Sequence, residues 1–360
     1  LKNYQVSYQL AQQVLQIDSL DKTALTIYGI SCIELEKFDQ AKKTFLLLLQ
    51  IDSQEPWNYN SLSTIYQKTQ DEKRALACGW KAVELSNGDE KQHLNFGYLL
   101  YELSDDSKIN YAQQWQKKYG DNAIVKHMSN AILHQQKITK ADSEYVQKLF
   151  DEFADDFEDV LTSLEYRAPQ LLAREMKEIY QPQILRKKQI LDLGCGTGWC
   201  GNFLKKYTSK KYLYGVDMSE KMLSKAIAKK CYGKLIKADL EQYLETTESR
   251  FDIIVAADVF TYFGDLQKVI QGCFRTLKKQ GWILFTVSAN LSNEKEYDLH
   301  DSGRFIHHKK YVMSLLEKKG FSIEKISEEI LRNEGEKTVI GYEIRIEDRK
   351  SGSAGMPRPI

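Results

Sequence analysis

Three glycines on alternate positions follow an apolar run that ends in an acid. Residues 190–198 read ILDLGCGTG, with the acid at Asp192 and the glycines at Gly194, Gly196 and Gly198. This pattern is typical of a strand that enters a tight turn, where a Cβ atom would block the turn and any ligand approaching the backbone. The sequence therefore predicts a ligand-binding loop at this point.

Three further apolar runs downstream also end in a carboxylate, at Asp217, Asp239 and Asp258. The carboxyl ends of parallel strands meet at one edge of a sheet, and open α/β sheets bind their ligands there. We therefore expect the four acids to surround one site.

The elements that must position these residues alternate along the chain. Helical patterns occur at residues 199–206, 219–230, 266–277 and 309–319, and Ser219 is a suitable N-cap for the second of them. Strands that alternate with helices demand a largely parallel sheet covered on both faces. Two later apolar segments, residues 321–330 and 338–346, are separated only by a polar turn, which predicts a hairpin at one edge of the sheet.

The first third of the chain carries an internal repeat. The triplet Ile-Asp-Ser at residues 17–19 recurs at residues 51–53, an offset of 34 residues, and Ala41 matches Ala75 at the same offset. This is the period of tetratricopeptide repeats, which are pairs of antiparallel helices. Residues 1–135 therefore resemble a short tetratricopeptide array, although serines replace the proline that usually closes each unit. An unrelated helical bundle is the alternative.

The glycine loop leaves two cofactors open. Gly196, Gly198 and Gly201 also match the dinucleotide fingerprint, and Asp217 lies about 20 residues further on, as an NAD site requires. S-adenosylmethionine is favoured because Asp192 can meet a methionine ammonium group, whereas a pyrophosphate would gain nothing from its charge. Asp239 is placed to accept the adenine amino group. The terminal hairpin is also unlike the second half of a dinucleotide-binding fold.

The ordered acids and glycines resemble the motifs of class I S-adenosylmethionine-dependent methyltransferases. The similarity is greater to the bacterial subgroup with an N-terminal tetratricopeptide segment, through FDEFADDF at 150–157, LEYRAP at 164–169, AADVFTYFGDL at 256–266 and GRFIH at 303–307. The resemblance implies an α/β fold with a Rossmann-like, doubly wound, seven-stranded sheet and an edge hairpin, preceded by an all-α domain. It places the repeats at 1–135, a polar linker at 136–144, the methyltransferase domain at 145–348 and a flexible tail at 349–360.

The resemblance also assigns residues to the cofactor. The set comprises Asp192, Gly194, Cys195, Gly196, Gly198, Asp217, Met218, Asp239, Leu240, Ala256, Phe153 and Arg167. Asp217 is expected to accept both ribose hydroxyls, with Met218 against the adenine and the Leu240 amide beside it. Phe153 belongs to a helix that lies over the cofactor in related enzymes, and Arg167 is placed to reach a carboxylate. Packing, helix capping and a buried ion pair are the structural alternatives for these side chains.

Methyl transfer from a sulfonium mainly requires that the acceptor be aligned and water excluded. His307 is the candidate general base, because the pKa of an imidazole lies near neutrality. Asp258 and Tyr262 follow the fourth strand, beside the expected methyl group, and are candidates for orienting the acceptor. A structural cap is the alternative for His307 and Asp258. No cysteine or histidine spacing indicates a metal site.

Composition restricts the partners. The 360 residues carry a formal net charge of +1, which implies no strong attraction to nucleic acid, and no apolar run is long enough to span a bilayer. Six cysteines without paired spacing fit reduced thiols and a cytoplasmic location. The expected function is methyl transfer to an unidentified acceptor, with the repeat groove recruiting a protein or peptide. A small-molecule methyltransferase, a non-catalytic scaffold and an NAD(P) enzyme are the alternatives; the oligomeric state is not indicated.

We predict that the chain binds S-adenosylmethionine and its product S-adenosylhomocysteine and shows no preference for NAD. The reason is the combination of the glycine loop with Asp192, Asp217 and Asp239. Titration calorimetry with the three compounds checks this, and heat released by NAD alone would contradict it.

Overall fold

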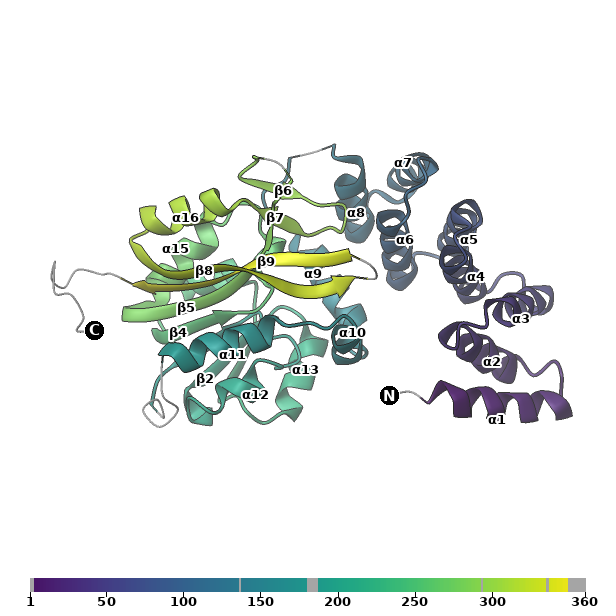
Figure 1. Cartoon of the computed structure of the whole chain (residues 1–360), viewed down its shortest axis with the longest axis horizontal. Helices are drawn as coiled ribbons and strands as arrows, with labels where there is room; N and C mark the ends of the chain where they lie inside the picture. Colours follow the sequence, from purple (N-terminus) through teal and green to yellow (C-terminus); the bar gives the residue numbers. More distant parts are fainter. Residues whose placement is uncertain (1–2, 136, 180–186, 293, 335–336, 349–360) are drawn as a thin grey trace. The chain divides into compact units, whose positions relative to one another are not determined.

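The computed structural model describes residues 3–135, 137–179, 187–292, 294–334 and 337–348. The chain divides into two compact units, Leu1–Gln135 and Gln136–Ile360. The first is helical and the second combines helices with a sheet (Figure 1). Within these ranges no helix has the length and apolarity needed to cross a membrane. The expected tail at 349–360 lies outside the described residues.

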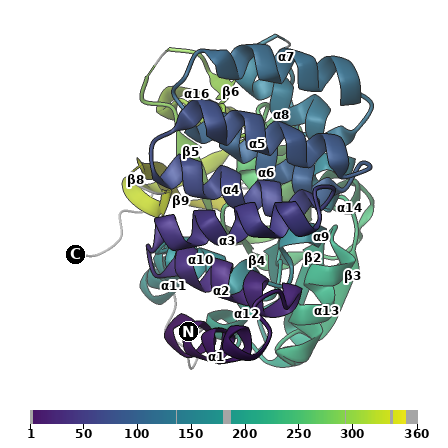
Figure 2. The same ribbon diagram turned by 90° about the vertical axis from the view of Figure 1, so that its right-hand side faces the viewer.

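The first unit consists of short antiparallel helices that pack on their neighbours in chain order. They are α1 (Tyr4–Ile17), α2 (Lys22–Glu34), α3 (Phe38–Ile51), α4 (Pro56–Lys68), α5 (Glu72–Leu85), α6 (Glu90–Glu102), α7 (Ser107–Tyr119) and α8 (Ala123–Leu133). Figure 2 shows α1 to α5 stacked in this order. Side chains of Asp21, Asp71 and Asp89 cap the starts of α2, α5 and α6.

The turn between α2 and α3 recurs between α4 and α5. Glu36 and Gln70, which lie 34 positions apart, both adopt left-handed backbone angles, with φ of 57° and 60°. In both turns the amide of the next residue, Lys37 or Asp71, donates to the carbonyl five residues back at 2.8 Å. The 34-residue period of the sequence is therefore also a period of backbone geometry over these two helix pairs.

The second unit begins with three helices and continues as alternating strands and helices. Its helices are α9 (Ser143–Phe153), α10 (Phe157–Ser163), α11 (Ala168–Ile179), α12 (Gly201–Leu204), α13 (Glu220–Ala228), α14 (Leu240–Thr246), α15 (Gln267–Thr276) and α16 (Lys309–Lys318), with 3₁₀ turns η2 (Lys210–Tyr212) and η3 (Phe260–Tyr262). Its strands are β1 (Ile190–Leu193), β2 (Leu213–Asp217), β3 (Lys234–Lys237), β4 (Phe251–Ala256), β5 (Leu277–Ala289), β6 (Tyr297–Leu299), β7 (Phe305–His307), β8 (Phe321–Glu334) and β9 (Lys337–Asp348).

The sheet has a parallel centre and an antiparallel edge. Strands β3, β2, β1, β4 and β5 pair in this order and in parallel, and β9 then pairs antiparallel with β5 and with β8. These seven strands, which include the β8–β9 hairpin, match the expected fold. The short antiparallel pair β6–β7 is an addition that the sequence did not predict. Ser288 of β5 pairs with Ile306 of β7 and with Gly341 of β9, so β7 lies on the β4 side of β5.

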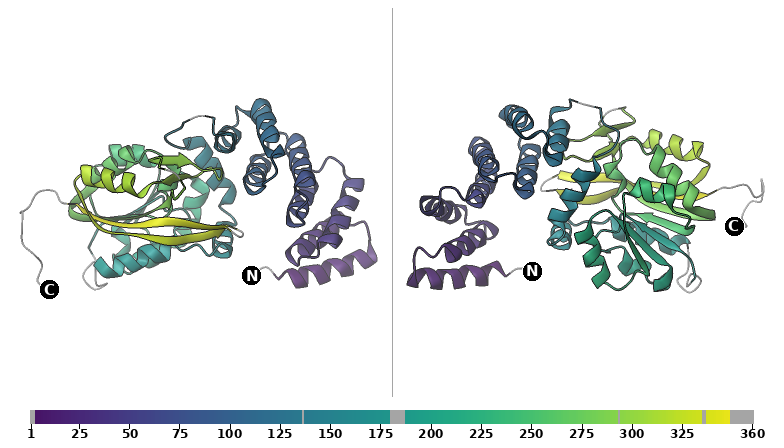
Figure 3. Two further views of the ribbon diagram at one scale, coloured as in Figure 1. Left: turned by 45° about the horizontal axis from the view of Figure 1, so that its top comes forward. Right: turned by 180° about the vertical axis from the view of Figure 1, so that it is seen from behind.

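Helices cover both faces of the sheet. On one face, Leu172 of α11, Leu204 of α12 and Leu223 of α13 pack with Ile190 and Ile253 of the central strands in one buried cluster. Figure 1 shows α11, α12 and α13 on this side of the strands and α15 and α16 on the other, and Figure 3 repeats the arrangement from two further directions. Burial of the central strands β1 and β4 on both faces explains why their sequences are almost continuously apolar.

Most predicted helices have nearly the expected bounds. The Ser219 hydroxyl accepts the Met222 amide at 3.1 Å, so the predicted cap of α13 is present. The helix predicted at 199–206 is reduced to the single turn of α12, and the described residues before it form turns. Helix α14, which Asp239 caps, was not predicted.

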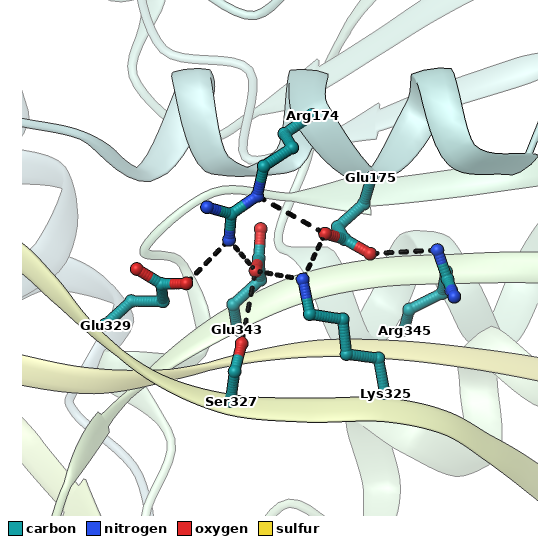
Figure 4. A network of polar contacts seen from close by, with 7 residues as sticks. All are labelled: Arg174, Glu175, Lys325, Ser327, Glu329, Glu343 and Arg345. Atoms are coloured by element: carbon teal, nitrogen blue, oxygen red, sulfur yellow. Dashed lines mark hydrogen bonds and ion pairs between the residues drawn. The ribbon is translucent and has the colours of Figure 1, made fainter.

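A buried ionic network joins α11 to the β8–β9 hairpin (Figure 4). Its members are Arg174, Glu175, Lys325, Ser327, Glu329, Glu343 and Arg345. Glu175 and Glu343 have fully buried side chains. Glu343 accepts from Arg174 at 2.6 Å and from Lys325 at 3.2 Å. Glu175 pairs with Lys325 at 2.5 Å and with Arg345 at 2.9 Å. A charge in such a place is tolerated only when it is paired.

We predict that Glu343→Ala lowers the free energy of unfolding by about 2 kcal/mol, because it removes the charged hydrogen bonds that the buried carboxylate accepts from Arg174 and Lys325. The matched control is Glu329→Ala, which removes one pair to the half-exposed Arg174 and should cost about 0–1 kcal/mol. Urea unfolding measures both. Equal effects would show that burial of Glu343 is unimportant.

Candidate functional site

A cavity lies at the carboxyl ends of β1, β2 and β4. It encloses about 910 Å³ of empty space, part of which is open to solvent. Of the residues predicted from the sequence, those in its walls are Gly194, Gly196, Asp217, Met218, Asp239, Leu240, Asp258 and Tyr262. The sheet edge therefore gathers three of the four expected acids around one space.

Asp217 holds the glycine loop against the end of β2. Its Oδ2 accepts the Gly196 amide at 2.8 Å and its Oδ1 accepts the Ser219 amide at 2.9 Å. Burial raises the pKa of this carboxyl, while the amides of Ser219 and Gly196 act in the opposite direction. A carboxylate has about four acceptor positions, so Asp217 retains capacity for ligand hydroxyls.

The loop itself fits a ligand that lies against its backbone. Gly196 has a φ of 52°, and a Cβ atom there would enter the cavity, with its nearest neighbour, Phe157, 3.8 Å away. Gly194 has a φ of 72°, and a Cβ atom there would come within 2.5 Å of Val259. Gly196 therefore keeps the cavity open, and Gly194 allows Val259 to pack closely against the loop.

Asp239 marks one end of the cavity and is already surrounded by donors. Its Oδ2 accepts from Lys140 Nζ at 3.0 Å and from Ser143 Oγ at 2.9 Å, and its Oδ1 accepts the Gln242 amide at 3.2 Å. Burial raises the pKa of Asp239, but the bonds from Lys140, Gln242 and Ser143 outweigh it, so the net shift is downward. Lys140 and Ser143 lie in the segment expected to be a polar linker, and both belong to the cavity wall.

The opposite end of the cavity is a charged cluster that contains Asp258. Asp258 adopts a left-handed φ of 56°, its amide donates to Thr286 Oγ1 at 2.8 Å, and its Oδ2 accepts from Arg332 at 2.7 Å. Arg332 and Arg304 both donate to Glu334, and these charges hold the pKa of Glu334 near 2 against the effect of burial. Left-handed angles outside glycine are uncommon and cluster at functional sites.

Arg332 is a cavity residue that sequence reasoning missed. The strand β8 alternates, and simple alternation would put Arg332 on the same side as the exposed Ile330. The pairing register shifts between these two residues, and both Leu331 and Arg332 are consequently buried. A β-bulge of this kind redirects a side chain. The neighbouring residues 327–334 are mostly charged or polar, so the sequence carries no signal that singles out Arg332.

Helices α9 and α10 cover the cavity. Phe150 of α9 and Phe157 and Leu161 of α10 line it. Polar contacts fix the two helices to their surroundings. Glu158 of α10 bonds Thr197 of the glycine loop at 2.6 Å and also bonds Lys229. Asp151 of α9 bonds Ser219 at the start of α13 at 2.5 Å, and Asp155, between α9 and α10, bonds Lys225 of α13 at 2.7 Å.

His307 does not line the cavity, contrary to the role of general base expected for it. The side chain is fully buried, and Nε2 donates to the carbonyls of Phe263 at 2.8 Å and Gly264 at 3.2 Å. Burial lowers its pKa to about 4 despite these two bonds, so the ring is neutral near pH 7. Its ring stacks on Tyr311. His307 therefore fixes the turn after η3 and does not face the expected acceptor.

Other predicted cofactor residues lie behind the cavity wall or beside it. Among the described residues, those that do not line the space are Asp192, Cys195, Gly198, Ala256, Phe153 and Arg167. Asp192 is buried, accepts from the Tyr232 hydroxyl at 2.5 Å, and has a pKa raised to about 7 by burial. Burial also keeps the pKa of the Cys195 thiol well above its usual range, which excludes a nucleophile at pH 7. Arg167 is exposed.

Known proteins resemble part of this chain. Residues 184–330 match the family model described as a methyltransferase domain. A malonyl-[acyl-carrier protein] O-methyltransferase of Priestia megaterium is 32% identical over 28% of this chain and 37% of that protein. The protein of the same name in Halalkalibacterium halodurans is 27% identical over 45% of this chain and 60% of its own. The chain thus spans less than two thirds of these relatives.

A solved structure is also similar to part of this chain. An S-adenosylmethionine-dependent methyltransferase from Clostridium acetobutylicum is 15% identical, with a TM-score of 0.41, over 56% of this chain and 99% of that one.

We predict that Asp217→Ala weakens S-adenosylmethionine binding by about 1.5–3 kcal/mol, roughly 10- to 150-fold, through loss of charged hydrogen bonds. The Gly196 amide also loses its acceptor, so the loop should become more mobile. The control is Asp155→Ala, an exposed acid on the cover that pairs with Lys225. Calorimetry with both variants provides the test, and unchanged affinity in Asp217→Ala would remove this residue from the site.

Proposed function

We propose that this chain, whose residues 184–330 form a methyltransferase domain, transfers the methyl group of S-adenosylmethionine to an acceptor held near Asp258, Tyr262 and Arg332. The family match confirms the expected methyltransferase domain, and with it an enzyme and its cofactor. The proposal rests on one observation: a single cavity joins the glycine loop and Asp217 to a charged cluster at its other end.

The half of the cavity near β1 and β2 suits the cofactor. Bound S-adenosylmethionine supplies a methyl group on a positively charged sulfur. In our proposal Asp217 accepts the ribose hydroxyls, the backbone at Gly194 and Gly196 lies under the methionine part, and Met218 and Leu240 contact the adenine. The apolar side chains of Phe150 and Phe157 exclude water above it.

The other half suits an acceptor that must be oriented. Tyr262 is buried, and burial raises the pKa of its phenol despite the opposing effect of Arg304, so it stays protonated near pH 7 and serves as a hydrogen-bond donor. Asp258 Oδ1 is buried and accepts no hydrogen bond within the described part of the chain. Arg332 fixes the other oxygen at 2.7 Å. Asp258 can therefore accept an O–H or N–H hydrogen from the acceptor, the task first expected of His307.

We further propose that the helical unit is a tetratricopeptide array that recruits a protein carrying the acceptor. The repeated turns and the 34-residue period support the array. The name of the Halalkalibacterium relative places the acceptor of that enzyme on a carrier protein. The alternative is a small-molecule acceptor, with the repeats serving assembly only. A non-catalytic scaffold is disfavoured because the loop and the cavity are intact.

Recruitment predicts that removing the repeats changes acceptor use but not cofactor affinity. A truncated protein that starts at residue 137 should bind S-adenosylmethionine as the full chain does, since the second unit is compact by itself. With radiolabelled cofactor and a bacterial extract, the full chain should label the macromolecular fraction and the truncated protein should label it much less. Equal labelling by both, confined to small molecules, would contradict recruitment.

A further inference from the structure

The segment at residues 139–143, here called the strap, contacts both ends of the cavity. At the acceptor end, the Ala141 amide donates to the Tyr262 carbonyl at 2.9 Å, and the Thr139 carbonyl accepts the amides of Gly264 and Asp265 at 2.9 Å each. Lys140 forms a bridge with Phe263 in antiparallel sense. The strap is therefore bonded through its backbone to the last residue of η3 and to the residues that follow it.

At the other end, two side chains of the strap converge on one carboxylate. Lys140 Nζ lies 3.0 Å from Asp239 Oδ2 and 3.0 Å from Glu241 Oε2, and Ser143 Oγ lies 2.9 Å from Asp239 Oδ2. The side chains of Lys140, Asp239 and Glu241 are all less than 30% exposed. One ammonium group thus bridges two neighbouring carboxylates and offsets their mutual repulsion in a poorly solvated place.

These contacts constrain where Asp239 can point. Oδ1 is tied to the Gln242 amide as the cap of α14, and Oδ2 is tied to Lys140 and Ser143. With three of about four acceptor positions in use, the remaining one is confined to a narrow direction. Lys140, Ser143 and Asp239 all line the cavity.

We propose that Lys140 and Ser143 are positioning residues for the cofactor, because they hold Asp239 where its carboxylate receives the adenine amino group. This inference rests on the proposed function. It makes the strap part of the wall of the cofactor site, although its sequence is that of a polar linker. Lys140 acts through Asp239 and through the charge balance with Glu241; the lysine itself does not contact the adenine.

The test compares Lys140→Met with Lys140→Arg by calorimetry with S-adenosylhomocysteine over a range of pH. Loss of the ammonium should weaken binding about 10-fold at pH 7. The deficit should widen as the pH falls, because the pKa of Asp239 is depressed mainly by Lys140 among its donors and should rise without it. The groups that act on Asp239 are Lys140, Ser143 and Gln242, with Glu241 beside Lys140. Lys140→Arg should restore most of the affinity.

The matched control is Lys148→Met, on α9, which removes a pair with the exposed Glu144 and should leave binding and its pH profile unchanged. Amide hydrogen exchange of the ligand-free proteins supplies a second measurement. Exchange at residues 139–143 should accelerate in Lys140→Met and not in the control.

Three outcomes would overturn the inference or its premise. Normal affinity of Lys140→Met at every pH, with normal binding by the wild-type chain, would refute positioning and leave the proposed function intact. Weaker binding with unchanged exchange and no change in the pH profile would indicate a direct contact of Lys140 with the ligand and would also refute it. Failure of the wild-type chain to bind S-adenosylhomocysteine would instead refute the proposed function.

Discussion

The carboxylate of Asp217 connects the parts of the molecule on which the site depends. Leu193 and Val216 are paired in register at the ends of β1 and β2, so the glycine loop and Asp217 emerge side by side. A buried carboxylate must collect donors, and the donors available are the amides of Gly196 and Ser219. The same interaction therefore sets the shape of the loop and the start of α13. Ser219 then caps that helix and binds Asp151 of α9, so the position of Asp217 also influences the helices that cover the cavity.

Helices α9, α10 and α11, at the start of the second unit, are attached to the rest of that unit by ion pairs of different strength. Helix α11 is fixed to the β8–β9 hairpin by acids that are fully buried, and breaking such pairs is costly. The pairs of α9 and α10 with α13 involve partly exposed side chains such as Lys225 and Asp155, and pairs of this kind contribute about 0–1 kcal/mol and weaken with salt. The chain thus places its firm attachment beside the sheet and its weak attachments over the cavity.

The sequence was sufficient to predict those elements whose structure follows from a local residue pattern. The glycine loop, the Ser219 cap, the parallel strands and the edge hairpin depend on short-range rules, and these elements are present. Prediction failed where burial depends on segments far apart in the chain. His307 is buried because β7 pairs with β5 and η3 lies against it, and Arg332 turns inward because of a bulge. Lys140 read as a linker residue because its two acidic partners are 99 and 101 positions away.

The edges of the sheet show how the protein avoids unwanted association. An edge strand with unpaired backbone groups is a template for another chain. At one edge, β3 is only four residues long and exposes Lys234 and Lys237 at its ends. At a second edge, β8 carries two register shifts and the exposed acids Glu324 and Glu328. Charges and bulges at these two edges oppose pairing with a further strand, so strand addition at β3 and at β8 should be suppressed even when the protein is concentrated.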